Sequence, residues 1–454
     1  MTTIFAKKAF LRDGWAENVR LKISDGLIQS VDVNSKSHTA DVREDIVLPG
    51  IANAHSHAFQ RALVGHSEKR EPKSLDNFWS WRTQMYRLAN IITPEQLSAI
   101  ASQLYSEMIS FGYTSVAEFH YLHGAKESTN RSQEMYMALA QAAEDSGIRL
   151  CYVPILYERS GFGSDRPRGE QHRFAMLLEE FIDHYEQVRE SANTRVIVGL
   201  GAHSLRAVHP DSLSRLAQLS LRDGCPLHIH ISEQMAEVEQ CLAHHKARPI
   251  EWLLKELPVD RRWCLVHATH ASEQELDALA ETHAVICLCP STEANLGDGI
   301  FKLNAWLEKN GRIAIGSDSH VTVNPFEELR WIEYEQRLLS RSRNVAVFED
   351  THIGQGLFQR VVQGGTTSCG HSKDSLCPGG YADLVCLDEQ HPVLLGHESD
   401  SILDALVFSG YPLPINRVMV GGAWYAAQGV HIYEKEIKKR FQHVVGDLWN
   451  TAQS

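Results

Sequence analysis

The chain has 454 residues, enough for one large and one small domain, and its 43% hydrophobic and 22% charged residues are typical of a globular protein. The formal net charge of -13 argues against nucleic acid or an anionic membrane as a partner, because both favour basic surfaces. An acidic protein that binds an anionic substrate must do so with a few well-placed arginines.

The first residues, MTTIFAKKAFLRDGW, lack the basic, apolar and small-residue sections of a signal peptide. No apolar run reaches the roughly 18 residues of a membrane span. The nine cysteines include no CxxC pair, and several lie in apolar, strand-like runs. We therefore expect buried free thiols in a cytoplasmic protein, with disulfides or thiolate metal ligands as the alternative.

Both ends of the chain are predicted to form strands. VRLKIS and LIQSVDV alternate apolar and polar residues, and Asp25-Gly26 between them is a strong hairpin signal. After about residue 375, ADLVCLD and RVMVGGAWYAAQGVHIY again indicate strands. We predict that residues 1–48 and 375–432 build one small β-sandwich domain, followed by a C-terminal helix over residues 433–454.

Residues 49–374 show a different pattern, in which short apolar runs alternate with amphipathic stretches of helical length. The runs are TSVAEF, LCYVPILY, RVIVGLGAH, CPLHIHIS, WCLVHAT, AVICLC and RIAIGSD. The helix candidates lie near 93–111, 131–147, 171–190, 209–222, 234–256, 272–281 and 325–341. With the strand that ends at His55, these make eight strand–helix units, which predicts an α/β fold of the (β/α)8 TIM-like barrel type. An open doubly wound sheet is the alternative, but it would not need eight units.

Two histidines follow the first apolar run of this region, IVLPGIANA, in His55-Ser56-His57. Residues i and i+2 of a strand project to the same side, so both imidazoles can bind one ion. The pattern is weak by itself, because a chain with 24 histidines contains such pairs by chance. His228-Ile229-His230 is a second example, and we expect His228 to be a structural residue of its strand.

Other polar side chains stand at the ends of runs that are otherwise apolar: His230, His267 and Asp318. A buried imidazole or carboxylate without a partner is costly, so each needs a hydrogen bond or a metal ion. The carboxyl ends of barrel strands meet at one mouth, which favours a shared metal site over separate core residues. Glu233 follows His230 by three residues and is either a solvated loop acid or a group that exchanges protons at that mouth.

Several motifs that the sequence lacks restrict the kinds of catalytic site it can form. The sequence has no HExxH, PCxxC or GxSxG, so three common hydrolase and deaminase arrangements are unsupported. No lysine occurs between Lys126 and Lys246, a span that covers the third, fourth and fifth strands. A barrel hydrolase with two metals commonly bridges them through a carboxylated lysine on its fourth strand. A site with one metal is therefore favoured.

PGIANAHSHA, HIHISEQ, LVHATH and GSDSH occur in the order found in the amidohydrolase superfamily, which the chain resembles over essentially its whole length. NFWSWRTQMYRL, AEFHYLHG, HSLRAV, STEANLGDGIF and EELRWIEYEQRL are similar to the formimidoylglutamate deiminase family. This resemblance implies zinc-dependent hydrolysis of N-formimino-L-glutamate to N-formyl-L-glutamate and ammonia in histidine degradation. The alternative is another deaminase of the superfamily with one metal, acting on a purine, a pterin or a related heterocycle.

The resemblance also implies roles for individual residues. One zinc ion per chain, with iron or manganese as alternatives, would be bound by His55, His57, His230 and Asp318. Proton transfer would involve Glu233, His267 and Asp318. The small dicarboxylate substrate would be contacted by Gln60, Arg82, Tyr121, His203 and Arg206. The polar segment from His66 to Asp76 does not fit the family pattern, and its role, as a lid or an entry loop, stays open. A homodimer is compatible with the sequence.

Overall fold

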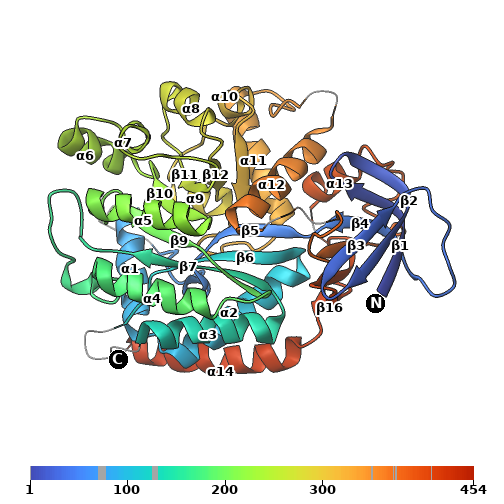
Figure 1. Cartoon of the computed structure of the whole chain (residues 1–454), viewed down its shortest axis with the longest axis horizontal. Coiled ribbons are helices and arrows are strands. Elements are labelled where there is room, and N and C mark those ends of the chain that lie inside the picture. Colours follow the sequence, from blue (N-terminus) through green and yellow to red (C-terminus); the bar gives the residue numbers. More distant parts are fainter. Residues whose placement is uncertain are drawn as a thin grey trace.

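The computed structural model describes residues 2–69, 78–124, 131–348, 351–371, 373, 376–410 and 412–453. They form two sheets, with the larger one wrapped by helices and the smaller one at one side of it (Figure 1). Helices within these described ranges include none that is long and apolar enough to cross a membrane.

The larger sheet closes into the predicted parallel barrel. Its order is β6-β5-β13-β12-β11-β10-β9-β7-β8, and an additional β6–β7 pairing closes a ring of eight strands with β8 outside it. The strands are β5 (Ile51–Ser56), β6 (Tyr113–His120), β7 (Arg149–Leu156), β8 (Val196–Val198), β9 (Leu200–Ser204), β10 (Leu227–Ile231), β11 (Trp263–His267), β12 (Val285–Leu288) and β13 (Arg312–Ile315). Almost every residue in them is buried, which explains the continuous apolar runs.

Helices follow the barrel strands and cover the outside of the ring (Figure 1). They are α1 (Phe78–Ile91), α2 (Pro94–Ser110), α3 (Arg131–Ser146), α4 (Leu178–Glu190), α5 (Pro210–Asp223), α6 (Met235–His245), α7 (Pro249–Glu256), α8 (Glu273–Ala280), α9 (Pro290–Leu296), α10 (Leu303–Leu307), α11 (Pro325–Ser340) and α12 (Ile353–Ser368). The candidate 234–256 is wrong as a single helix. Lys246 takes a left-handed conformation that ends α6, and Pro249 opens α7.

The smaller sheet is built from both chain ends, as predicted. Its order is β17-β16-β15-β14-β4-β1-β2-β3. The strands are β1 (Thr2–Leu11), β2 (Gly14–Ser24), β3 (Leu27–Asp32), β4 (Val42–Pro49), β14 (Leu384–Leu387), β15 (Ile415–Val420), β16 (Ala423–Ala427) and β17 (Val430–His431). Asp25 and Gly26 both have positive φ, 54° and 76°, and form the expected turn between β2 and β3. The domain boundaries near residues 48, 375 and 432 remain a prediction.

Contacts at Gly50 and at Arg149 are among those that join the smaller sheet to the barrel. β4 runs into β5 through Gly50, where a Cβ atom would overlap the side chain of Thr114, so the chain crosses between the sheets in a space that favours glycine. Arg149 of β7 makes a buried ion pair with Asp383, which precedes β14, at 3.2 Å.

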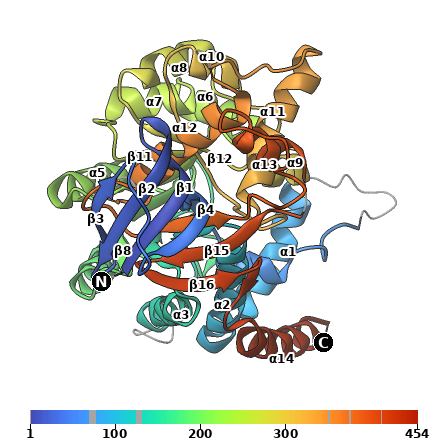
Figure 2. The same ribbon diagram turned by 90° about the vertical axis from the view of Figure 1, so that its right-hand side faces the viewer.

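The last helices are α13 (Ile402–Phe408) and α14 (Glu434–Gln453). Figure 2 shows α14 beside α2. The indole of Trp449 in α14 donates a hydrogen bond to the carbonyl of Ala62, at 3.2 Å. Ala62 ends the short helix η1 (Ala58–Ala62), which follows the HxH pair directly. The C-terminal helix therefore supports the segment next to the barrel mouth.

Candidate active site

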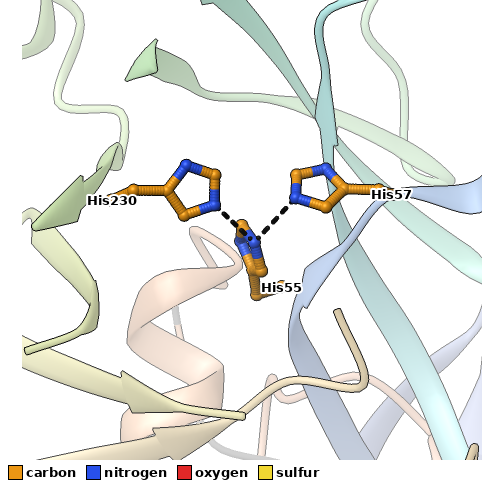
Figure 3. Close-up of side chains that lie close together, drawn as sticks. All are labelled: His55, His57 and His230. Carbon is orange, nitrogen blue, oxygen red and sulfur yellow. Dashed lines mark hydrogen bonds between the residues drawn. The ribbon is translucent and has the colours of Figure 1, made fainter. Parts of the chain in front are cut away.

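His55 and His57 lie at the carboxyl end of β5 and point to a common centre (Figure 3). Their Nε2 atoms are 3.1 Å apart, and the Nε2 of His230, at the end of β10, is 3.0 Å from that of His55. Two of the rings come from the carboxyl end of β5 and the third from β10, and His55 and His230 are 175 residues apart in sequence. The barrel therefore brings together the three histidines that the strand ends suggested.

Asp318 follows β13 and completes this group. Its Oδ1 is 3.4 Å from the Nε2 of His55 and 3.2 Å from that of His57. The Asp318 N–H donates to the carbonyl of His55, and the His57 N–H donates to the carbonyl of Asp318. These backbone bonds fix the end of β13 against β5, so the carboxylate is held beside both rings.

Hydrogen bonds at the far side of two rings orient them. The Nδ1–H of His57 donates to the carbonyl of Phe119 at 2.9 Å, and that of His230 donates to the carbonyl of His203 at 3.0 Å. Each Nε2 is then left as a free lone pair that faces the centre. Burial lowers the pKa of His55 to about 3 and lowers the pKa of His57 and His230 as well, so the rings are neutral at pH 7.

The donor set fits one metal ion. Four ligands at about 2.1 Å around a tetrahedral ion are about 3.4 Å apart, close to the separations of these nitrogen and oxygen atoms. Burial would raise the pKa of Asp318, but the hydrogen bond to His55 and the nearby imidazoles lower it, so a carboxylate is present. Three neutral imidazoles and one carboxylate are ligands that suit zinc.

His267, at the end of β11, stands beside this group with its own carboxylate partners. Its Nδ1 donates to Glu293 at 3.1 Å, and its Nε2 is 3.9 Å from Asp318 and 4.0 Å from Glu233. Burial disfavours the charged imidazolium, but Glu233 and the hydrogen bond to Glu293 outweigh it and raise the pKa of His267 to about 10. Burial raises the pKa of Glu233 above its ordinary value. These two side chains can exchange a proton at the site.

The backbone is strained where two of these residues sit. His267 has a φ of 71° and Asp318 a φ of 46°, in the left-handed region that side chains other than glycine rarely adopt. Such strain costs on the order of 1–3 kcal/mol per residue and persists where the surrounding structure imposes it, often at functional sites. From these positions the two side chains approach each other, with the Nε2 of His267 3.9 Å from Asp318.

Three of the candidate substrate residues cluster beside His57. The amide of Gln60 donates to the hydroxyl of Tyr121 at 2.9 Å, and its Oε1 is buried with no hydrogen-bond partner among the described residues. The ring of Tyr121 is 4.9 Å from that of His57 and 5.6 Å from that of His203, between ring centroids. Gln60 thus offers an unused hydrogen-bond acceptor close to the candidate metal site.

The two candidate arginines line a cavity of about 550 Å³ together with Trp79 and Tyr86. Arg82, on α1, donates to the hydroxyl of Tyr157 at 3.1 Å. Arg206, just after β9, is 7% exposed, and its buried Nε has no hydrogen-bond partner in the described part of the chain. Among the described residues no ion pair links either guanidinium to a carboxylate. Both remain available to an anionic ligand.

A family model described as the amidohydrolase family matches residues 46–425, and one described as the N-terminal domain of the formimidoylglutamate deiminase HutF matches residues 1–45. The chain belongs to the amidohydrolase family. A formimidoylglutamate deiminase of Pseudomonas aeruginosa is 42% identical to this amidohydrolase over 455 residues, 99% of the chain and 100% of the relative. An 8-oxoguanine deaminase of the same species is 28% identical, in an alignment that covers 86% of the chain and 84% of that relative.

Solved structures show the same fold over nearly the whole amidohydrolase. The crystal structure of an amidohydrolase from Brucella melitensis aligns with a TM-score of 0.94 at 40% identity and covers 99% of the chain and 100% of its own. An atrazine chlorohydrolase of Arthrobacter aurescens complexed with zinc aligns with a TM-score of 0.84 at 18% identity, covering 98% and 100%. At 18% identity, the similarity to the atrazine chlorohydrolase shows only that the two proteins share a fold.

Several residues of this amidohydrolase site were not found from the sequence. Glu118 accepts hydrogen bonds from Ser56 and Ala58 and so supports the ligand strand, and Glu293 orients His267. The sulfur of Cys289 lies within 4.8 Å of donor atoms of His267 and Asp318. Of these residues, only Glu118 had a sequence feature that could have identified it, because it is a carboxylate inside the apolar run TSVAEF.

The segment from His66 to Asp76, for which the sequence leaves a lid or an entry loop open, lies partly outside the described residues, which stop at residue 69 and resume at residue 78. The described part contacts two distant elements. The ring of His66 stacks on that of Trp449 with centroids 3.8 Å apart, and Glu68 accepts a hydrogen bond from Asn295. The role of this segment, as a lid or an entry loop, stays open.

Proposed function

We propose that this amidohydrolase hydrolyses N-formimino-L-glutamate to N-formyl-L-glutamate and ammonia, as a step of histidine degradation, with one zinc ion per chain. The observation that carries the proposal is a combination at one barrel mouth: a metal-ligand cluster, and two arginines that form no ion pair with a carboxylate of the described chain. Arg82 donates to Tyr157, whose ring lies 4.8 Å from that of His203, and the carbonyl of His203 accepts from His230. The name and the 42% identity of the Pseudomonas aeruginosa relative support the same substrate.

The substrate has opposite charges at its two ends. Its formimino group is a cationic amidine, which suits the carboxylates of Glu233 and Asp318, while its two carboxylates suit guanidinium forks. Arg82 and Arg206 would bind the carboxylates. Gln60 would accept a hydrogen bond from a substrate N–H through its unpaired Oε1, next to the hydroxyl of Tyr121.

The metal would be bound by His55, His57, His230 and Asp318. When bound, zinc lowers the pKa of water toward about 7 and polarises the group under attack. His267 would orient the attacking water through its Nε2, because Glu293 fixes its Nδ1. Iron or manganese can bind a similar donor set, so metal analysis of purified protein is part of the test.

The reaction is balanced without any other reactant. The water oxygen bonds to the formimino carbon, the bond from that carbon to the terminal nitrogen breaks, and both water protons end on the departing nitrogen. Glu233 would carry a proton from the water to that nitrogen, and Asp318 would accept one transiently. Both are buried, at 6% and 5% exposure, which limits the loss of these protons to solvent.

The test is ammonia release from N-formimino-L-glutamate compared with guanine, 8-oxoguanine, adenosine and cytosine, each with and without a chelator. We expect turnover of the amidine alone, its loss with chelator, and recovery on adding zinc. Turnover of a heterocycle instead would replace the proposal with the deaminase alternative. Absence of turnover with a full complement of zinc would refute it.

A cytoplasmic location and a homodimeric assembly extend the proposal. All nine cysteines are free thiols, which a reducing compartment preserves. Localisation of a tagged chain and sedimentation of the purified protein measure the two properties. An extracellular protein or a monomer would contradict them without affecting the proposed reaction.

A further inference from the structure

One indole ring lies close to both arginines of the mouth. The guanidinium carbon of Arg82 is 5.5 Å from the ring centroid of Trp79, and that of Arg206 is 5.9 Å from it. Trp79 and Arg82 are three residues apart on α1 and share a helix face, whereas Arg206 comes from the segment after β9. The ring of Trp79 therefore bridges the two elements that supply the guanidinium groups.

Two like charges at one cavity need something to hold them there. Neither arginine forms an ion pair with a carboxylate of the described chain, although Glu233 and Glu237 interact electrostatically with Arg206. Arg82 also lies over Tyr86 at 5.1 Å and donates to Tyr157. A carboxylate in place of the indole would hold both guanidiniums, but it would occupy the N–H groups that a substrate needs. An aromatic face attracts a guanidinium through its quadrupole and leaves the N–H donors free.

We propose that Trp79 is a positioning residue that sets the spacing of Arg82 and Arg206, and thereby selects ligands with two carboxylates. The inference rests on the proposed function, because it concerns the same mouth. The cavity beside the ring has a volume of about 550 Å³, and Trp79, Arg82 and Arg206 all line it. A ligand that carries one carboxylate engages one guanidinium and gains nothing from their spacing.

The experiment compares Trp79→Leu and Trp79→Phe with the wild type on N-formimino-L-glutamate and on N-formiminoglycine, which has a single carboxylate. Two cation–π contacts of surface strength correspond to roughly a 10-fold effect. We expect Trp79→Leu to raise KM for the dicarboxylate about 10-fold, with kcat and zinc content within about twofold of the wild type. KM for the glycine derivative should change less than about threefold, and Trp79→Phe should keep most of the wild-type affinity.

Two controls separate positioning from general damage. Trp331→Leu on α11 removes an indole of similar exposure, 36% against 40%, at a position outside the mouth, and should leave both KM values unchanged. In an Arg206→Ala background, Trp79→Leu should add less than its effect in the wild type, because part of its action passes through Arg206. Equal losses for both substrates, or full additivity with Arg206→Ala, would overturn the inference.

A direct binding measurement keeps the inference apart from the proposed function. Calorimetry with N-formyl-L-glutamate, a dicarboxylate, requires no turnover. If the wild type binds it and Trp79→Leu binds it about 10-fold more weakly, the inference holds even where the proposed reaction fails. If the wild type does not bind this dicarboxylate, or the variant binds it equally well, the inference is wrong.

Discussion

Glu118 offers a test of how the metal-ligand strand is held in place. The carboxylate is 1% exposed and accepts hydrogen bonds from the Ser56 hydroxyl and the Ala58 N–H, both at 2.6 Å, and from the Tyr105 hydroxyl at 3.1 Å. Glu118→Ala removes the acceptor of all three. The Ser56 hydroxyl can turn to the Nε2 of His320, 3.4 Å away, so two donors are left buried without a partner.

An unsatisfied buried donor costs about 1–3 kcal/mol, so we expect Glu118→Ala to lower the free energy of unfolding by about 2–6 kcal/mol. With about 2.1 cal/mol/K of unfolding entropy per residue, a chain of 454 residues loses about 1 °C of Tm per kcal/mol. Calorimetry of the metal-free protein should therefore show a Tm lower by about 2–6 °C. Zinc affinity should fall about 10- to 100-fold, because Ser56 and Ala58 flank a ligand.

Glu118→Gln is the matched variant, since its amide can accept from Ala58 and donate to the two hydroxyls. Near pH 4.5, where the wild-type carboxyl is protonated, its Tm should stay within about 2 °C of the wild type. Burial raises the pKa of Glu118 to about 7 from 4.5, so the folded carboxyl keeps its proton where the unfolded one loses it. Wild-type stability therefore falls as pH rises from about 4.5 to 7, on the order of 3 kcal/mol, and the glutamine variant lacks this contribution. An alanine variant with wild-type Tm and zinc affinity would refute the reasoning.

Three further outcomes are expected. Arg206→Ala should raise KM for N-formimino-L-glutamate about 10- to 100-fold at unchanged zinc content, because a buried fork loses charge-assisted hydrogen bonds; loss of zinc would mean that Arg206 has another role. Glu233→Gln should keep zinc and lower kcat by about 10²- to 10⁴-fold in the ammonia assay, and full activity would remove it from proton transfer. Asp318→Ala and His230→Ala should each abolish turnover and leave well below one zinc per chain by elemental analysis, which a fully loaded variant would contradict.

Much of the fold follows from the sequence because its signals are local. Apolar runs such as LCYVPILY are continuous since a barrel strand is buried on both faces, and the Asp25-Gly26 turn needs positive φ at both residues. The break between α6 and α7 was missed, although Pro249 could have indicated it. The helices α1 and α12 were also missed, since α1 has an irregular apolar pattern and α12 contains four glycines within its length.

The candidate ligands could be predicted because each combines a local signal with one rule of the fold. Parallel barrel strands end at the same mouth, so the polar residues at their carboxyl ends, His230, His267 and Asp318, must approach one another. Their roles stay predictions. Glu293 and Trp79 could not be found in this way, because each acts on a partner from another element, and no spacing within the chain encodes the contact between Trp79 and Arg206.

The charge distribution at the mouth accounts for how an acidic chain could bind the proposed substrate, which carries two negative charges. Carboxylates surround the metal candidate closely enough to raise the pKa of His267 to about 10, so this end of the site attracts cations. At the other end Arg82 and Arg206 lie against aromatic rings, and neither forms an ion pair with a carboxylate among the described residues, although Glu233 and Glu237 interact electrostatically with Arg206. A ligand with a cationic amidine at one end and carboxylates at the other matches both ends in one orientation only. A flat neutral heterocycle would leave the two guanidiniums without partners, and the same geometry therefore disfavours it.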